Sequence, residues 1–397
     1  MKIIFISGLY SPYIGGGAEI SNKLLVEGLN KANTNIEVIT LGEKNVEEKI
    51  NGVLVKRMFI NNITKKYLEN IKLRKTKVEL IEKIQRILYK IFCILNRNIY
   101  KQIDGKLKES NGDILHTSSI NLFFPILWWK IAKKNKMKVI HTLRDPYLIY
   151  FRGFNSKNKI INILDKFNKK IYHYYLNKYV DYIHSPSEYM INFHKNSGFN
   201  FNKSVVIPNT ITIESINVVF KSKEIDVLYV GNISKQKGVE TLVTACKNNI
   251  KCIFVGDGEL KEKLLINGIT VTGWLEEKKV LEYMQKSKIL VLPSEWEEAF
   301  GRVLIEGIAS GSLVIGSDQG AIPEVLNYDE RYIFKAKSVS SLSEKIDRIL
   351  ALSEEEYKEE LNYLQKYIEK FNYDNHIKQF KEFYCNILSE ENGEDVL

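Results

Sequence analysis

The stretch EEAFGRVLIEGIASG, residues 297–311, contains two glutamates, Glu298 and Glu306, with seven residues between them. Glu298 stands in a polar loop, whereas Glu306 lies inside the apolar run 303–309. Moving a carboxylate from water into apolar surroundings costs several kcal/mol of free energy unless hydrogen bonds compensate for the lost hydration. Glu306 is therefore predicted to accept hydrogen bonds from a ligand, and the hydroxyl pair of a sugar is suited to this. A surface helix with two ordinary salt-bridging glutamates is the alternative interpretation.

The same stretch is predicted to contain a helix over about 302–309, directly after the loop Pro293–Phe300 and a glycine. The unpaired N–H groups and the dipole of a helix N-terminus attract phosphate. Glu298 would lie just before this helix, and Glu306 about one turn inside it. An anion site beside two hydroxyl acceptors suits a nucleotide sugar, in which a diphosphate joins two polyols.

The stretch resembles the Glu-x7-Glu motif of retaining glycosyltransferases of family 4, which have the GT-B fold. Other segments resemble that family in the same order and at its spacing. They are SPYIGGGAEI (11–20), VLYVGNISKQKGVETLVTA (227–245), IFVGDGELKEKL (253–264), TGWLEEKKVLEYMQKSKILVLPSEWEEAFG (272–301) and GSDQGAIPEVL (316–326). Each motif alone is weak, but the ordered set covers most of the chain and is specific.

Apolar runs typical of strands alternate with helix-period segments, which favours parallel sheets built from βα units. The predicted strands are Ile3–Ser7, Val38–Leu41, Ile114–Thr117, Val139–Leu143, Tyr182–Ser185, Asp226–Val230, Cys252–Val255, Ile289–Pro293 and Leu313–Gly316. Together with the resemblance, the pattern predicts an α/β protein of the GT-B fold. Two Rossmann-like domains would have parallel sheets facing an interdomain cleft, where open α/β sheets bind ligands at their carboxyl ends.

The predicted domains are an N-terminal acceptor-binding domain over residues 1–205 and a nucleotide-sugar-binding domain over residues 206–371. The helix-poor segment 205–227 is the predicted connector. In the family that the chain resembles, the corresponding C-terminal segment returns to the first domain. A helix at about 372–390 is therefore expected to pack back on the N-terminal domain.

The resemblance also implies a set of donor-binding residues. They are Gly16, Gly17, Gly231, Asn232, Lys237, Glu298, Ala299, Phe300, Gly301, Val303 and Glu306. Lys237 would contact the donor diphosphate, Glu298 and the backbone at 299–301 would hold the hexose, and Glu306 would hold the ribose. The family often has arginine at the position of Asn232, and Lys235 is the nearby cation that could compensate.

The catalytic residues predicted in this way are Glu298, Lys237 and Arg144. Many members of the family have histidine where the segment HTLRDPY (141–147) has Arg144. His141 is three residues earlier, on the opposite face of a strand, and is a poor substitute. An arginine stays protonated and cannot act as a base. We expect Arg144 to hold the donor sugar or phosphate by forked hydrogen bonds.

The activity that the resemblance implies is transfer of a hexose or N-acetylhexosamine with retention at the anomeric carbon. The donor would be a nucleotide diphosphate sugar, and the acceptor a glycan or lipid-linked hydroxyl in bacterial surface polysaccharide synthesis. No cofactor and no metal are expected, because the sequence has neither a DxD motif nor a His/Cys cluster with ligand spacing. The sequence leaves open the sugar, the base and the acceptor.

Composition is consistent with a globular enzyme of 397 residues. The cysteines form no CxxC pair, which favours reduced thiols and a cytoplasmic location, with the inner face of the membrane as a place of action. The opening MKIIFIS is predicted to be a strand rather than a signal peptide. The longest apolar run, residues 122–129, is too short for a bilayer of about 30 Å.

The formal net charge is +10, and residues 61–110 carry thirteen Lys or Arg against five Asp or Glu. An apolar stripe at helical spacing runs from Leu80 to Leu95. Such a helix could lie on an anionic membrane surface, or it could face the core with a solvated basic back. Two other classes stay open: a nucleic-acid-binding protein, which lacks supporting motifs here, and another GT-B sugar-nucleotide enzyme such as an epimerase or a phosphorylase.

Overall fold

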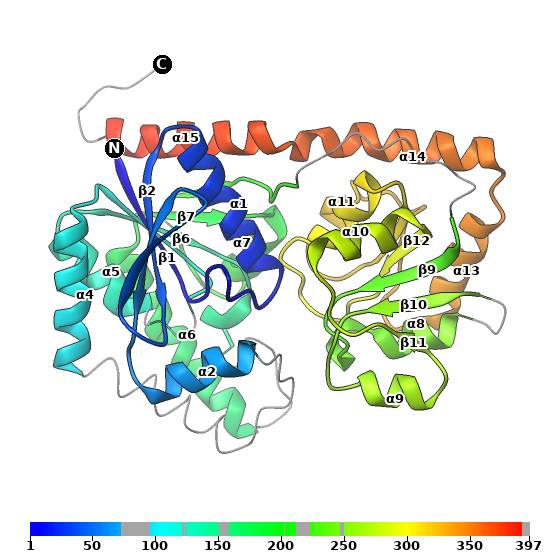
Figure 1. Ribbon diagram of the computed structural model, residues 1–397, viewed down its shortest axis with the longest axis horizontal. Coiled ribbons are helices and arrows are strands. Elements are labelled where there is room, and N and C mark those ends of the chain that lie inside the picture. The colour runs from blue at the N-terminus through cyan, green and yellow to red at the C-terminus, as the bar shows by residue number, and fades with distance from the viewer. Residues whose placement is uncertain are drawn as a thin grey trace. The chain divides into compact units, whose positions relative to one another are not determined.

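The computed structural model describes residues 1–72, 96–120, 123, 125–150, 159–201, 203–211, 223–246 and 250–390. The chain divides into two compact units (Figure 1). The N-terminal unit comprises Met1–Pro208 and the residues from Asp374 onward, and the C-terminal unit comprises Asn209–Tyr373. Residues 212–222 of the predicted connector lie outside the described ranges.

The N-terminal unit is built on a sheet with the strand order β3-β4-β2-β1-β5-β6-β7-β8. Its strands are β1 (Lys2–Ser7), β2 (Asn35–Leu41), β3 (Val46–Ile50), β4 (Val53–Met58), β5 (Ile114–Ser118), β6 (Lys138–Thr142), β7 (Tyr182–Ser185) and β8 (Ser204–Val206). All neighbouring pairs are parallel except β3 with β4. The predicted strands of this half are therefore confirmed, with β3, β4 and β8 added.

The pair β3–β4 is a hairpin that the sequence analysis missed. Its two-residue turn is Asn51-Gly52, with φ of 49° and 84°. Positive φ at both central residues matches the twist of an antiparallel hairpin, and Asn-Gly is the dipeptide that adopts it most readily. The signal was thus present in the sequence.

Helices flank this sheet (Figure 1). They are α1 (Gly17–Lys31), α2 (Asn62–Lys72), α4 (Arg97–Ser110), α5 (Pro125–Lys134), η1 (Pro146–Leu148), α6 (Lys159–Tyr179), α7 (Glu188–Asn196) and α15 (Tyr373–Ser389). Helix α1 packs on β1 and β2, and α5 packs on β5 and β6. The side chains of β1 from Ile3 to Ile6 are fully buried, so the core lies on both faces of the sheet.

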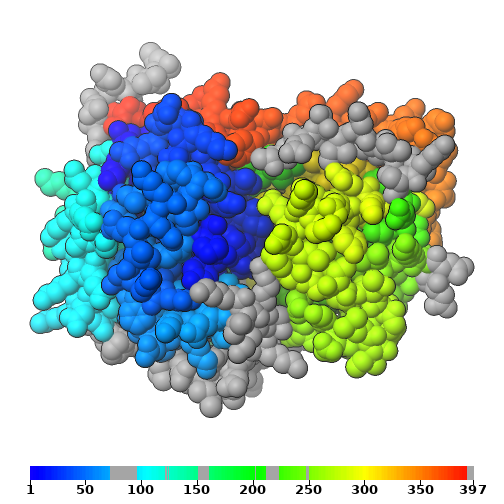
Figure 2. Space-filling model, in the orientation of Figure 1, coloured from blue at the N-terminus to red at the C-terminus, as the bar shows by residue number. Residues whose placement is uncertain are grey.

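Helix α4 belongs to the basic stretch 61–110, and it shows where the lysines of that stretch lie in its described part. Ile99, Ile103 and Leu107 recur at helical spacing and are buried, while the lysines of α4 face outward. The helix forms the surface at one side of the unit, cyan in Figure 2. The predicted stripe from Leu80 to Leu95 lies outside the described residues.

The apolar run at 122–129 enters the core. Its described part opens α5, in which Trp128 and Trp129 are fully buried. The indole Nε1 of Trp129 donates to Thr117 Oγ1 at 3.0 Å, so its polar atom is satisfied. Among the helices within the described ranges, none has both the length and the hydropathy that crossing a bilayer requires.

Helix α15 is held on the N-terminal sheet by buried aromatic and polar contacts. Tyr384 Oη lies 2.7 Å from Nδ1 of His116, whose Nε2 is 2.6 Å from Thr142 Oγ1. The ring of Phe380 lies 4.8 Å from that of His184. Burial holds the pKa of His116 and of His184 well below the usual range, so both imidazoles are neutral within this network.

The C-terminal unit is built on a fully parallel sheet with the order β11-β10-β9-β12-β13-β14. Its strands are β9 (Ile225–Val230), β10 (Cys252–Val255), β11 (Thr270–Val271), β12 (Ser287–Leu292), β13 (Leu313–Ser317) and β14 (Ile333–Phe334). Its helices are η3 (Lys235–Lys237), α8 (Val239–Ala245), α9 (Lys261–Ile266), α10 (Glu277–Gln285), α11 (Arg302–Ala309), α12 (Ile322–Val325), α13 (Val339–Leu350), α14 (Glu354–Ile368) and η4 (Glu369–Phe371). The four strands predicted here are confirmed.

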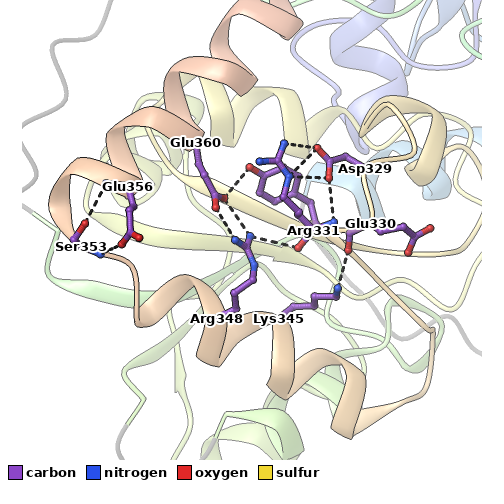
Figure 3. A network of polar contacts seen from close by, with 9 residues as sticks. Asp329, Glu330, Arg331, Lys345, Arg348, Ser353, Glu356 and Glu360 are labelled. Carbon is purple, nitrogen blue, oxygen red and sulfur yellow. Dashed lines mark hydrogen bonds and ion pairs between the residues drawn. The ribbon is translucent and has the colours of Figure 1, made fainter.

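A network of charged groups fastens α13 and α14 to the end of this sheet (Figure 3). The guanidinium of Arg348 donates to both carboxylate oxygens of Glu360, at 2.6 and 3.1 Å. The hydroxyl of Tyr332 donates to the same carboxylate at 2.8 Å. Ser353 and Glu356 form a capping box at the start of α14. The bidentate pair and the cap together fix the orientation of α14.

We expect Glu360→Ala to lower the stability of the C-terminal unit by about 1–3 kcal/mol, because it leaves the half-buried guanidinium of Arg348 without its partner. Calorimetric unfolding of the whole chain measures the loss. Glu359→Ala is the matched control, since Glu359 is the exposed neighbour on the same helix. Equal melting temperatures for the two variants would contradict the prediction.

Candidate functional site

In each sheet, the chain adds strands on one side of a central strand and then on its other side. In the C-terminal unit β9 lies between β10 and β12, and in the N-terminal unit β1 lies between β2 and β5. The loops that follow such neighbouring strands diverge, and ligands of open α/β sheets bind in the space between them. The segments that follow β9 and β12 carry Lys237 and Glu298. Gly16 ends the loop after β1, and Gly17 begins α1.

The loops after β9 and β12 cross at very short distance. Gly238 has φ of 66°, and a Cβ atom there would lie 1.8 Å from the carbonyl oxygen of Pro293. Only glycine fits this crossing, because any side chain would overlap with backbone. Glu295 N also donates to Gln236 O at 2.8 Å. The crossing places the residue before Gly238 directly beside the second loop.

That residue is Lys237, and it contacts Glu298. Lys237 Nζ lies 2.5 Å from Glu298 Oε1, and the two side chains are 28% and 15% exposed. A largely desolvated pair of opposite charges is stronger than a surface pair. The structure therefore brings together two residues predicted to bind different parts of the donor, and their opposite charges compensate each other.

The loop between β13 and α12 fixes the backbone of Glu298. Ala321 N donates to Glu298 O at 2.8 Å. A Cβ atom on Gly320 would lie 2.3 Å from Glu298 N, so glycine is required for this approach as well. Glu298 thus stands in a loop held from both sides rather than in a free surface turn.

Helix α11 begins at Arg302 and ends at Ala309, as predicted. Its N-cap is Gly301, with φ of 87°, and no side chain caps its first turn. The preceding Phe300 is buried and packs edge-on against Phe371 with ring centroids 5.4 Å apart. The side chain of Phe300 is therefore a core element, and only its backbone is suited to the predicted donor contact. Val303 is partly buried against the same core.

Glu306 has an intramolecular ion-pair partner, as the alternative interpretation of the sequence allows, but the sequence analysis did not identify which residue it is. Arg302 Nη2 lies 2.5 Å from Glu306 Oε1, one turn away on α11. Burial raises the pKa of Glu306, and the Arg302 guanidinium partly reverses this shift. The Nε and Nη1 atoms of Arg302 are buried and have no hydrogen-bond partner among the described residues. The i,i+4 spacing of the two residues was the signal available in the sequence.

The other donor-binding residues predicted after β9 have packing roles. Gly231 has φ of 154°, and a Cβ there would lie 3.0 Å from the hydroxyl of Tyr229. A Cβ on Gly256 would lie 1.8 Å from the carbonyl oxygen of Gly231. These glycines allow the ends of β9 and β10 to approach closely. Asn232 is exposed, and its carbonyl accepts a hydrogen bond from Tyr229 Oη at 2.7 Å.

The glycine loop of the N-terminal unit is open. A Cβ on Gly17, the first residue of α1, would meet no atom within 4 Å, and one on Gly16 would meet only Glu19 Oε2, at 3.9 Å. Packing within the described residues therefore does not require glycine at either position. Space that a side chain would occupy is left free at the end of β1, where a ligand could approach the backbone.

Arg144 lies at the carboxyl end of the same sheet, just after β6. Its Nη2 donates to Asn22 Oδ1 at 3.1 Å and its Nε to Ser118 Oγ at 3.3 Å. Ser118 Oγ in turn donates to Asn22 Oδ1 at 2.8 Å. The guanidinium is thus oriented by side chains from α1 and β5.

His141 is a core histidine. It is fully buried, with Nδ1 2.9 Å from Thr117 Oγ1 and Nε2 3.1 Å from Tyr147 Oη. Burial lowers the pKa of His141 to about 3, so the ring stays neutral. The expectation that it is a poor substitute for a catalytic histidine is consistent with this environment.

Glu19 is a second residue that the sequence analysis missed. It lies in the first turn of α1 and is half-buried, with its carboxylate against the backbone of Gly16. Desolvation raises the pKa of Glu19 to about 7; the backbone at Glu19 and Gly16 and the Arg144 guanidinium oppose this shift, while Asp145 adds to it. A carboxyl that titrates near neutral pH beside the glycine loop can hold or release a proton there. Its position in GGGAE gave no sign of this, because the effect comes from tertiary burial.

Within the described ranges, no three His, Cys, Asp or Glu side chains are grouped so that they could hold a metal ion. Cys246 and Cys252 are half-buried free thiols, and Cys385 is exposed. The prediction that the reaction needs no metal is not tested by this observation.

Comparison with known proteins connects this geometry to a family. A model described as Glycosyltransferase Family 4 matches residues 15–215, and one described as Glycosyl transferases group 1 matches residues 211–375. An uncharacterized 42.6 kDa protein in the cps region of Klebsiella pneumoniae is 30% identical over 342 residues, which is 82% of this chain and 87% of that protein.

Solved structures share the fold at low sequence identity. Sucrose-phosphate synthase from Thermosynechococcus elongatus has a TM-score of 0.75 and 16% identity, covering 98% of this chain and 99% of that one. Anabaena Alr3699/HepE in complex with UDP and glucose has a TM-score of 0.70 and 14% identity, covering 97% and 99%.

Two α/β units with parallel sheets and these neighbours define the GT-B fold of glycosyltransferases, as the sequence predicted. The chain belongs to Glycosyltransferase Family 4 and has a relative in the cps region of Klebsiella pneumoniae.

Glu19 generates a prediction about pH. Its pKa is about 7 in the folded chain and near 4.5 when exposed, so between these values only the folded state keeps the proton. Stability contributed by this group therefore falls, by about 1–3 kcal/mol, as the pH rises from about 5 to about 8. Glu19→Gln removes the ionisation, and the melting temperature of the variant relative to the wild type should rise over this range.

Differential scanning calorimetry at several pH values measures this difference. Glu69→Gln, at an exposed carboxylate on α2, is the control and should show a constant offset. A constant offset for Glu19→Gln as well would mean that Glu19 does not titrate in this window.

Proposed function

We propose that this protein is a retaining glycosyltransferase that uses a nucleotide diphosphate sugar. It moves a hexose or N-acetylhexosamine to a hydroxyl of a glycan or lipid-linked acceptor, in the synthesis of bacterial surface polysaccharide or a related glycoconjugate. Peripheral contact with an anionic membrane at its cytoplasmic face is part of the proposal.

The observation that carries the proposal is the ion pair between Lys237 and Glu298 at the ends of β9 and β12. A diphosphate can replace Glu298 as the partner of Lys237, and a sugar hydroxyl can then donate to the released carboxylate. One ligand that brings both groups compensates both charges. The complex of Alr3699/HepE with UDP and glucose, a structure of the same fold, supports this choice of ligand.

In the proposed reaction, the acceptor oxygen bonds to the anomeric carbon on the face from which the diphosphate leaves. The bond between that carbon and the phosphate oxygen breaks, and the acceptor proton passes to the departing diphosphate. The protein then needs no strong base. Lys237 stabilises the charge that develops on the diphosphate, while Glu298 holds the hexose in position. Arg144, which cannot accept a proton, contributes positive charge and orientation.

Glu306 is proposed to hold the ribose of the nucleotide. Its carboxylate is 22% exposed and already accepts one hydrogen bond from Arg302. A carboxylate has enough lone pairs to accept from a ribose hydroxyl at the same time. The Arg302 guanidinium opposes the rise in the pKa of Glu306 that burial causes, and it therefore favours the charged carboxylate that would accept from the ribose.

Binding of nucleotides tests the donor assignment. We expect one of UDP, GDP or ADP, or its sugar conjugate, to raise the melting temperature of the chain by mass action. Lys237→Ala should abolish this shift, because the diphosphate loses its cation. Lys251→Ala, at an exposed lysine of the same unit, should leave it unchanged. If no nucleotide shifts the wild type, or if Lys237→Ala responds equally, the assignment is wrong.

Product analysis then separates the proposal from related enzymes. A transferase consumes the donor in proportion to glycosylated acceptor, with the donor's anomeric configuration in the product. An epimerase converts the donor without acceptor, and a phosphorylase requires inorganic phosphate.

Arg144→Ala should lower the turnover number by roughly tenfold to a hundredfold, because a positioned charge is lost from the transition state. Arg144→Lys keeps the positive charge but lacks the planar guanidinium that donates to both Asn22 and Ser118. This variant should recover only part of the rate. Steady-state kinetics with the donor found above measures both variants. Unchanged turnover in Arg144→Ala would refute the role.

A further inference from the structure

One helix of the N-terminal unit exposes an unusual number of apolar side chains. On α6, Ile163 is 67% exposed, Leu164 39%, Phe167 65% and Tyr174 56%. These four are among eleven exposed large hydrophobic residues in the part of the chain that the structure describes. Single exposed apolar residues are common, but a group on one helix face marks an interaction site.

The opposite face of α6 explains its attachment to the unit. Tyr172 and Leu176 are buried, and the amide of the buried Asn168 donates to the carbonyl oxygens of Tyr147 and Leu148, at 2.9 and 3.2 Å. Because the helix is held by these contacts, the exposed apolar face is not needed for packing. It is available to a partner without any change in the fold.

The exposed face is also basic. Lys166 and Lys170 are exposed at the same helical spacing as Ile163, Phe167 and Tyr174. The only acidic residue of α6, Asp165, is buried. The face therefore presents lysines among apolar side chains and carries no exposed carboxylate from the helix itself.

The C-terminal end of α6 adds tyrosines that pack with a lysine. Lys178 Nζ lies 5.4 Å from the ring centre of Tyr174 and 5.6 Å from that of Tyr179, and it donates to Tyr174 Oη at 3.2 Å. Tyrosine and lysine have apolar bodies with polar tips, and both are favoured at the boundary between water and lipid.

We propose that this face of α6, defined by Ile163, Lys166, Phe167, Lys170 and Tyr174, binds the surface of an anionic lipid bilayer. Ile163 and Phe167 enter the boundary between headgroups and acyl chains, and the lysines contact lipid phosphates. Apolar residues interleaved with lysines match a bilayer surface, where acyl chains lie directly beneath anionic headgroups. An acidic protein partner would require the lysines but not apolar side chains long enough to insert.

This inference builds on the proposed function, because a lipid-linked acceptor is presented at a membrane. It assigns the membrane contact to residues of α6, whereas the stripe from Leu80 to Leu95 that the sequence suggested lies outside the described residues. The substituted positions are exposed, so the variants below are expected to fold as the wild type does.

Flotation of the full-length chain with vesicles tests the proposal. The wild type should bind vesicles containing phosphatidylglycerol and should bind pure phosphatidylcholine much less. Ile163→Ser/Phe167→Ser and Lys166→Glu/Lys170→Glu should each weaken binding to the anionic vesicles about tenfold or more. The matched controls, Ile266→Ser on α9 and Lys366→Glu on α14, change exposed residues of the C-terminal unit and should bind as the wild type does.

Three results would overturn the proposal. The first is wild-type binding by both α6 variants, and the second is equal binding to neutral and anionic vesicles. The third is a concentration-dependent dimer in analytical ultracentrifugation that Ile163→Ser/Phe167→Ser abolishes, which would make a second copy of the chain the occupant. The nucleotide-induced shift in melting temperature is measured on the same variants and should persist. A loss of vesicle binding is thereby distinguished from a failure of the donor assignment.

Discussion

The crossing of two loops in the C-terminal unit is the constraint on which the candidate site depends. Gly238 lies against the carbonyl of Pro293 at a distance that excludes any side chain. Since β9 and β12 are neighbours in the sheet, their following loops could diverge without contact, and this crossing holds them together. It places Lys237 beside Glu298, while Gly320 lets a third loop hold Glu298 from the other side. Backbone packing, rather than long flexible side chains, thus sets the position of the charges.

The fold was predictable from the sequence because its parallel strands are short, buried apolar runs, and such runs differ clearly from the helices between them. Four of the five strands that escaped prediction, β3, β8, β11 and β14, lie at sheet edges, and the fifth, β4, lies between β3 and β2. The hairpin β3–β4 is an example, since its alternation VEEKI is mostly polar and only the Asn51-Gly52 turn marks it. The helix of the Glu-x7-Glu stretch was predicted from Gly301 and the apolar run that follows it.

The candidate site was less predictable, because its chemistry depends on neighbours that are distant in sequence or were not considered. Glu306 was treated as a carboxylate that needs a ligand, but Arg302, one turn earlier, already pairs with it. Phe300 matched a motif position, yet its side chain belongs to the core. Burial raises the pKa of Glu19, and of the two charged residues that follow a different strand, Asp145 adds to the shift while Arg144 opposes it. A motif identifies positions, whereas protonation and pairing arise from three-dimensional packing.

The N-terminal unit contains two separate segments of the chain, since α15 packs on β5 and β7 through Tyr384 and Phe380. On the ribosome, the sheet of this unit emerges long before α15, and the histidines that α15 covers remain without their aromatic partners during that time. Domains that consist of one continuous segment can fold as they are synthesised. This unit instead can complete its core only after the C-terminal unit has been translated, because its last helix follows that unit in the chain.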